Sequence, residues 1–338
     1  MVLLTGKEGL IHRTGKDIQN VFQNLFKQRG KWRREAAKLD GYYTTEAPHA
    51  RNDGKMVVCM FDGRMKHGGL VDRFRGIVSS YSVCKPLHIP FKIHFVHPFR
   101  LETYLMPNQV DWRIESSELC YNRADAFPVF CGSNDTHVEP PFQRLWLKQN
   151  FQKQARQVHV YTNAHLLRGK AFGPLFRELF RPTPVLQATI DVHLAMLGGD
   201  YVAMSSRFMA LLGDFEDCND QTLPPSDRAA YVQRVIDKIK DIHAKECPTS
   251  KVLIASDSVT FLAEAARLDF AYIVPGNVVH VDYTSGNQYD TYMKVFVDFF
   301  LLAKARKIYL LQQKGMYNTG FPRRAAQVGN IPLKHVRF

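Results

Sequence analysis

The feature that most constrains the fold is an alternation of short apolar runs with helical stretches along the chain. The runs 251–255 and 307–311 suit buried strands, and amphipathic helical stretches cover 259–268 and 289–305. Strands that alternate with helices predict a parallel α/β sheet, because each parallel connection needs a crossover that is usually helical. A strand at 55–61, followed by a glycine turn and a helix, starts the same pattern nearer the N-terminus. We therefore expect two Rossmann-like units.

The length of 338 residues and the hydrophobic fraction of 45% suit two globular domains. We expect three parts: a helical N-terminal arm and linker at 1–54, a first Rossmann-like domain at 55–182, and a second at 183–338. Within the arm, apolar residues recur at helical spacing over 17–26, and a basic helical stretch covers 31–38. The polar segment 115–150 shows no clear pattern of either kind.

The chain is basic, with a net charge of +13, which favours anionic partners such as phosphorylated ligands, a membrane surface or nucleic acid. No Asp or Glu occurs in 299–338. The six cysteines have no CxxC spacing, and no zinc pattern is present. We find neither a signal-peptide core nor an apolar run near the roughly 20 residues of a membrane span. We therefore expect a cytoplasmic protein that is at most peripherally membrane-associated.

Polar residues stand at the ends of three strands in the second half: Ser205, Ser206 and Arg207; Asp257 and Ser258; and Asn318 and Thr319. In open α/β sheets, ligands bind beyond the carboxyl ends of the strands. Arg207 would hold phosphates bidentately, and Asp257 would accept from guanine or from ribose hydroxyls. A helix start near Thr319 would cradle a β-phosphate. These groups together suit a nucleoside diphosphate.

Three of these residues also have a structural alternative. Arg207 could be a surface arginine that caps the next turn. Asp257 could be the N-cap of the helix at 259–268, and Thr319 could be a plain helix cap.

The order of these motifs resembles the fucosyltransferase superfamily, which covers bacterial α1,2-fucosyltransferases, nodulation-type α1,6-fucosyltransferases and protein O-fucosyltransferases. The similarity covers roughly 55–326. The motifs that carry it are a glycine motif at 67–73, an HxR motif at 205–207, an S-D element at 256–258, and a final element with Thr319, Arg323 and Ala325. Ser205 stands where the family has a histidine that helps to recognise guanine.

The resemblance implies a GT-B fold, in which two Rossmann-like domains with parallel sheets face each other across a cleft. It implies GDP-fucose as the donor, bound mainly by the second domain, and a glycan or glycolipid hydroxyl as the acceptor. It also implies inversion at the anomeric carbon, with no cofactor and no metal. The chain contains no DxD motif for a divalent ion that bridges a diphosphate. Arg207, helped by amides near Thr319 and by Arg323, would then stabilise the leaving diphosphate.

Four residues of the glycine motif are candidates for the site: Gly68 and Gly69 for binding the ligand, and His67 and Asp72, on the acceptor side, for catalysis. The two glycines let a ligand or another backbone approach closely. His67 and Asp72 are candidates for the base that activates the acceptor hydroxyl. Alternatively, His67 is only an exposed loop histidine, and Asp72 pairs with Arg73 or Arg75 on its helix.

Three other functions remain open at this point. They are a glycosyltransferase that uses another nucleotide sugar, a non-catalytic nucleotide-sugar-binding protein, and a basic nucleic-acid-binding protein. Only the charge supports the last one, because no RNA-binding aromatic signature, zinc finger or basic repeat is present. We expect no nucleic-acid partner.

Overall fold

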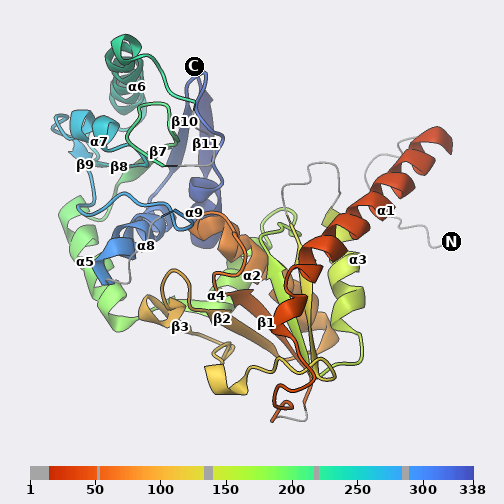
Figure 1. Cartoon of the computed structure of the whole chain (residues 1–338). Helices are drawn as coiled ribbons and strands as arrows, with labels where there is room; N and C mark the ends of the chain where they lie inside the picture. Colours follow the sequence, from red (N-terminus) through yellow and green to blue (C-terminus); the bar gives the residue numbers. More distant parts are fainter. Residues whose placement is uncertain (1–14, 52–53, 133–139, 217–220, 284–288) are drawn as a thin grey trace.

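The computed structural model of the chain describes residues 15–51, 54–132, 140–216, 221–283 and 289–338 (Figure 1). The strands form a parallel sheet of four strands, a parallel sheet of five strands, and a short antiparallel pair. This arrangement confirms the predicted α/β class with two parallel sheets.

The first sheet has the order β2-β1-β5-β4, with β1 (Met56–Phe61), β2 (Phe91–Phe95), β4 (Ala126–Cys131) and β5 (Gln157–Thr162), all parallel. Every side chain of the inner strand β1 is buried. A strand covered on both faces reads as a continuous apolar run, which is why the sequence predicted it. Helix α2 (Leu70–Cys84) packs closely on β5. A Cβ atom on Gly76 would lie 2.0 Å from the carbonyl oxygen of Thr162, so this approach requires glycine.

The second sheet has the order β11-β10-β7-β8-β9, with β7 (Val202–Ser206), β8 (Val252–Ser256), β9 (Ala271–Tyr272), β10 (Ile308–Gln312) and β11 (Leu333–Arg337), all parallel. In the central strand pair, Ser206 is in register with Ser256. The strands β7 and β8 therefore end at the same level, and the residues that follow them meet at one edge of the sheet.

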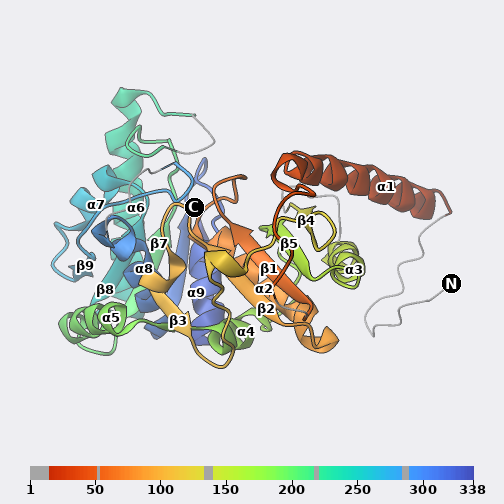
Figure 2. The same cartoon turned by 60° about the horizontal axis from the view of Figure 1, so that its bottom comes forward.

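The remaining helices are α1 (Gly15–Ala37), α3 (Pro140–Phe151), α4 (Phe172–Leu179), α5 (Pro184–Leu197), α6 (Pro225–Glu246), α7 (Val259–Ala265), α8 (Tyr289–Lys304) and α9 (Phe321–Gly329). The antiparallel pair is β3 (Leu105–Pro107) with β6 (Phe180–Pro182). Figures 1 and 2 show α2, α4, α8 and α9 gathered between the two sheets.

An aromatic cluster in this helical layer joins the two halves of the molecule. Phe74 of α2, Phe176 of α4 and Phe299 of α8 are buried, with ring centroids 5.1, 5.6 and 5.7 Å apart. Aromatic pairs at such distances stabilise a core by about 0.5–1.5 kcal/mol beyond the burial of their area. Buried side chains of both halves therefore belong to one hydrophobic cluster.

Within the described part of the N-terminal arm, one α-helix, α1, runs through 15–37, where the sequence predicted two helical stretches. Near its C-terminal end, Trp32 is buried and its ring lies 5.7 Å from that of Trp146 in α3. The rest of the helix extends away from the body of the molecule (Figures 1 and 2).

The sequence predicted neither helix α3 nor the strands β3, β4, β6 and β11. Both β4 and β11 are edge strands, which pair with a neighbour on one side only. Pro128 lies within the apolar run of β4, and an edge strand tolerates proline because it needs fewer ladder hydrogen bonds. A proline inside an apolar run argues against an inner strand, which is why β4 was not recognised within the segment 115–150.

Candidate functional site

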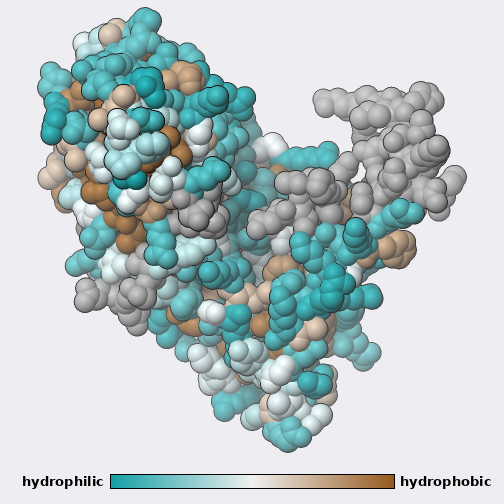
Figure 3. Space-filling view, turned by 45° about the horizontal axis from the view of Figure 1, so that its top comes forward, coloured by the Kyte–Doolittle hydropathy of each residue, from teal (hydrophilic) through white to brown (hydrophobic). Residues whose placement is uncertain are grey.

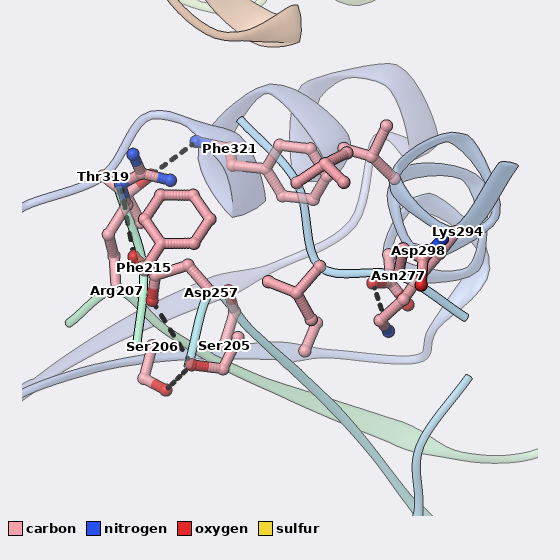
Figure 4. A pocket seen from close by; sticks show the side chains of 15 residues that line it. Ser205, Ser206, Arg207, Phe215, Asp257, Asn277, Lys294, Asp298, Thr319 and Phe321 are labelled. Atoms are coloured by element: carbon pink, nitrogen blue, oxygen red, sulfur yellow. Dashed lines mark hydrogen bonds and ion pairs between the residues drawn. The ribbon is translucent and has the colours of Figure 1, made fainter. Parts of the chain in front are cut away.

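A pocket with an empty volume of about 540 Å³, including its opening to solvent, lies at the carboxyl ends of β7 and β8 (Figure 4). The lining residues all belong to the second half of the chain: Ser205, Ser206, Arg207, Phe215, Ala255, Ser256, Asp257, Asn277, Val278, Val279, Lys294, Val295, Asp298, Thr319 and Phe321. The structure thus brings together four of the residues predicted to bind a ligand, namely Ser205, Arg207, Asp257 and Thr319.

Arg207 follows β7 directly and is held in place at the pocket by two neighbours. Its Nε lies 3.7 Å from Oδ2 of Asp257, and its guanidinium carbon lies 5.2 Å from the ring centroid of Phe215. The side chain remains 23% exposed. An arginine that is oriented by a carboxylate and a ring, yet still open to the pocket, can bind an anion at little further cost in side-chain entropy.

Asp257 organises the turn that carries Arg207. Its carboxylate accepts hydrogen bonds from the backbone N–H groups of Phe208 and Met209, both at 2.8 Å. Met209 has a φ of 55°, a left-handed conformation that is uncommon outside glycine and is fixed here by this contact. Burial raises the pKa of Asp257, while Arg207 and the two N–H groups lower it.

The alternative role of Asp257 as a helix N-cap is wrong. The cap of α7 is Ser258, whose hydroxyl accepts from the N–H of Phe261 at 3.1 Å and donates to Asp214 at 2.7 Å. Ser258 was predicted to bind the ligand, but it does not line the pocket. Asp257 itself lines the pocket, although both of its oxygens are already engaged by the turn.

Thr319 lies at the start of α9, where its Oγ1 accepts from the N–H of Phe321 at 3.2 Å. The N-cap residue of α9 is Gly320, so Thr319 is not the plain helix cap that the alternative supposed, and its hydroxyl proton is left to donate. Pro322 follows and has no N–H. Fewer backbone N–H groups are thus available to bind a phosphate at the start of α9 than the sequence analysis expected.

Asn318 and Arg323 lie near Thr319 but do not line the pocket. The Nη2 atom of Arg323 donates to Oδ1 of Asn318 at 2.8 Å and lies 3.2 Å from Nδ1 of His335 in β11. These contacts hold the Arg323 side chain toward the edge strand.

Asp72 lies in the first turn of α2, across from the pocket. It forms an ion pair of 2.6 Å with Arg75, which bears out one of its structural alternatives, and its side chain is 40% exposed. Partial burial raises the pKa of Asp72, whereas the positive charges of Arg75 and Arg207 lower it. The influence of Arg207 shows that this carboxylate lies within electrostatic reach of the pocket.

His67 is buried, with 2% exposure, so the alternative of an exposed loop histidine is wrong. Its ring lies 4.5 Å from that of Phe61 and 6.1 Å from that of Tyr161, and its Nε2 has no hydrogen-bond partner among the described residues. Burial and the nearby Arg73 lower the pKa of His67 to about 3. The imidazole is therefore neutral at physiological pH, and it does not line the pocket.

The glycine turn is approached by a carboxylate of the second half. Gly68, with a φ of 84°, donates its N–H to Asp282 at 2.5 Å. Arg73 of α2 binds the same carboxylate at 2.5 Å, and both side chains are buried. A Cβ atom on Gly68 would lie 2.8 Å from Oδ2 of Asp72, and one on Gly69 would lie 3.9 Å from the same atom. Gly68 thus makes room for the Asp72 carboxylate, whereas the distance at Gly69 is an ordinary contact that does not require glycine.

The lining residues that sequence reasoning missed include Phe215, Asn277, Lys294, Asp298 and Phe321. A signal was present for two of them. Lys294 and Asp298 are opposite charges four residues apart within the otherwise apolar helix 289–304. Charges on a buried helical face are rare unless they are paired.

Within the described ranges, no group of three or more His, Cys, Asp or Glu side chains could hold a metal ion. No helix in the same part of the chain is long and apolar enough to cross a membrane. On the face shown in Figure 3, most side chains are hydrophilic, with apolar ones scattered among them.

No family model matches this sequence, and no curated protein matches it either. Solved structures do match. A crystal structure of NodZ α1,6-fucosyltransferase soaked with GDP-fucose has a TM-score of 0.53 and 16% identity, with 81% of this chain and 92% of that chain covered. NodZ from Bradyrhizobium has a TM-score of 0.52 and 16% identity, with 80% and 92% covered.

A variant of Arabidopsis thaliana FUT1 in complex with GDP is also similar. It has a TM-score of 0.52 and 12% identity, with 95% of this chain and 78% of that chain covered. Because these identities are low, the matches establish the fold. The chain has the two-sheet α/β architecture of the fucosyltransferases, in agreement with the GT-B fold predicted from its motifs.

Proposed function

We propose that the chain is an inverting glycosyltransferase that transfers fucose from GDP-fucose to a hydroxyl of a glycan or glycolipid, without a metal ion. One observation carries the proposal. Arg207, held by Asp257, opens onto a pocket at the strand ends of a fold shared with fucosyltransferases, one of them soaked with GDP-fucose and another in complex with GDP.

In this proposal Arg207 is the main cation for the donor diphosphate. Negative charge grows on the leaving phosphate as the glycosyl bond breaks, and a guanidinium fixed in advance stabilises that charge. The hydroxyl of Thr319 can donate to the same phosphate, because its oxygen already accepts from Phe321. Loss of one such contact costs on the order of 3 kcal/mol of transition-state stabilisation.

Asp72 is the better of the two candidates for the acceptor base. It is partly exposed and its pKa is raised by the surrounding protein, whereas His67 is enclosed between Phe61 and Tyr161. A carboxylate with a raised pKa accepts a proton more readily near neutral pH. The acceptor oxygen would bond to the anomeric carbon as the bond from that carbon to the phosphate oxygen breaks. Asp72 would take the hydroxyl proton, and GDP would leave.

The other residues predicted for the site would support Arg207 and Asp72. Ser205 lines the pocket beside Arg207 and offers a hydroxyl to the donor. Gly68 leaves room for Asp72 to reach its position, and Gly69 precedes the helix that carries Asp72. Ser258, Asn318 and Arg323 would support the walls of the site, since none of them lines the pocket.

A thermal-shift panel of GDP, UDP, ADP and CMP, each in EDTA, tests the proposal. A ligand at 100 times its dissociation constant stabilises a protein by about 2.7 kcal/mol, which gives a measurable shift. We expect GDP to stabilise the wild-type protein most and to have little effect on Arg207→Ala. A preference for UDP, or binding that disappears in EDTA, would contradict it.

A further inference from the structure

A buried ion pair forms one wall of the pocket. On α8, Nζ of Lys294 lies 2.8 Å from Oδ2 of Asp298, and the two side chains are only 3% and 9% exposed. Both residues line the pocket, and Figure 4 shows them with Asn277 on one side of it, apart from Arg207 and Thr319. The pocket therefore has two polar ends.

The second oxygen of Asp298 has no partner. Oδ1 is buried, and no described residue donates a hydrogen bond to it. A buried acceptor without a donor costs about 1–3 kcal/mol, and more when it carries charge. Burial raises the pKa of Asp298, and Lys294 opposes this effect. An unsatisfied carboxylate oxygen in a pocket wall is the kind of group that a ligand donor would satisfy.

The other carboxylate that lines the pocket, that of Asp257, already accepts hydrogen bonds through both of its oxygens. The turn after β7 uses Oδ1 of Asp257 for the N–H of Phe208, and Oδ2 for the N–H of Met209. Asp257 therefore orients Arg207 at the phosphate end, and each of its oxygens has less capacity left to accept a hydrogen bond from a base. Asp298 is the buried candidate with a free oxygen.

We propose that Lys294 and Asp298 read the Watson–Crick edge of guanine in the donor nucleotide. This inference rests on the proposed function and deepens it. The edge presents O6 as an acceptor, then the N1–H and the N2 amine as donors. The ammonium of Lys294 would donate to O6, and the Asp298 carboxylate would accept from N1–H and N2–H. The apolar side chains of Val279, Val295 and Phe321 would face the flat base.

The same arrangement discriminates against other bases. Adenine would place its N6 amine against Lys294 and its unprotonated N1 against the carboxylate. Uracil would turn an acceptor, O2, toward the second carboxylate oxygen. Hypoxanthine offers O6 and N1–H but lacks the N2 amine. A site built to accept a hydrogen bond rejects analogues that cannot donate it.

The test is calorimetric titration with GDP, IDP, ADP and UDP. For the wild type we expect GDP to bind about tenfold or more tightly than IDP, because one hydrogen bond to a charged group separates them. The double variant Lys294→Met, Asp298→Leu removes both charges and leaves neither one unpaired. It should bind GDP and IDP equally. If it does not fold, Asp298→Asn replaces it, with the same expectation.

A matched control is Lys245→Met, Asp241→Leu, which makes the same changes in an exposed ion pair of α6 with the same four-residue spacing. It should keep the preference for GDP. Equal binding of GDP and IDP to the wild type, or a full preference for GDP in the double variant, would overturn the inference and leave an ordinary structural ion pair. The proposed function survives both results. It fails together with the inference only if the wild type binds no guanine nucleotide.

Discussion

Arg73 in α2 and Asp282 in the segment before α8 form an ion pair of 2.5 Å between the two halves of the molecule, with side-chain exposures of 2% and 7%. Arg73 also donates to the backbone oxygen of His97 at 2.8 Å, and Asp282 accepts from the N–H of Gly68. The pair therefore joins the glycine turn of the first half to the segment before α8 in the second half.

The ion pair of Arg73 and Asp282 should matter for the stability of the folded protein, because each buried charge needs the other as its partner. Asp282→Asn leaves Arg73 as an unpaired buried charge, so we expect the free energy of unfolding to fall by about 3–5 kcal/mol. Urea unfolding measures the change. Asp241→Asn, which removes a carboxylate from an exposed pair on α6, should change stability little. Equal stability of Asp282→Asn and the wild type would show that the pair does not hold the halves together.

Asp257 should control affinity through the position of Arg207. Asp257→Asn keeps one acceptor oxygen for the two N–H groups of Phe208 and Met209, so the turn loosens. We expect GDP to bind about tenfold more weakly. Asp214→Asn is the control, because Asp214 also accepts from a backbone N–H, that of Thr260, but lies outside the pocket. Unchanged GDP affinity in Asp257→Asn would refute this positioning role.

His67 should make the protein sensitive to mild acid. Its pKa is about 3 in the folded state because of burial and Arg73, and about 6.5 in an unfolded chain. As the pH falls from about 6.5 toward 3, the unfolded state binds a proton that the folded state does not bind. The free energy of unfolding therefore falls through this window.

Urea unfolding at pH 7.5 and pH 5 measures this loss. His67→Gln cannot titrate, so it should lose less stability between the two values than the wild type. His88→Gln, which changes an exposed histidine, should leave the loss unchanged. An identical loss in His67→Gln and the wild type would mean that His67 does not contribute.

The strands that carry the site could be predicted because they are inner strands. Their continuous apolar runs, and the polar residues that end them, predicted that Arg207, Asp257 and Thr319 would meet. Other features depend on contacts between distant segments. The ion pair of Arg73 with Asp282 joins positions 209 residues apart, and no local sequence pattern predicts it.

The functions of individual polar groups were harder to predict than their positions. The sequence could not show that Asp257 turns its oxygens toward Phe208 and Met209, because that depends on the backbone of the next turn. The burial of His67 likewise depends on how Phe61 and Tyr161 close over it.

Arg207 should act on turnover as well as on donor binding. Arg207→Ala should lower the rate of GDP release from GDP-fucose, in the presence of a panel of glycan acceptors, about a hundredfold or more. Arg207→Lys should restore little, because a point charge does not reproduce the planar fork. Arg267→Ala, at an exposed arginine of the same half, is the control. Normal turnover per folded Arg207→Ala molecule would remove Arg207 from the chemistry.

The central claim is that the pocket at the ends of β7 and β8 binds GDP-fucose through Arg207. Calorimetric titration of GDP-fucose into the wild type and into Arg207→Ala, both in EDTA, tests it most directly, with thermal unfolding to confirm that both are folded. We predict saturable binding of one GDP-fucose to the wild type and markedly weaker binding to folded Arg207→Ala. No binding to the wild type, or equal binding to both proteins, would contradict the account.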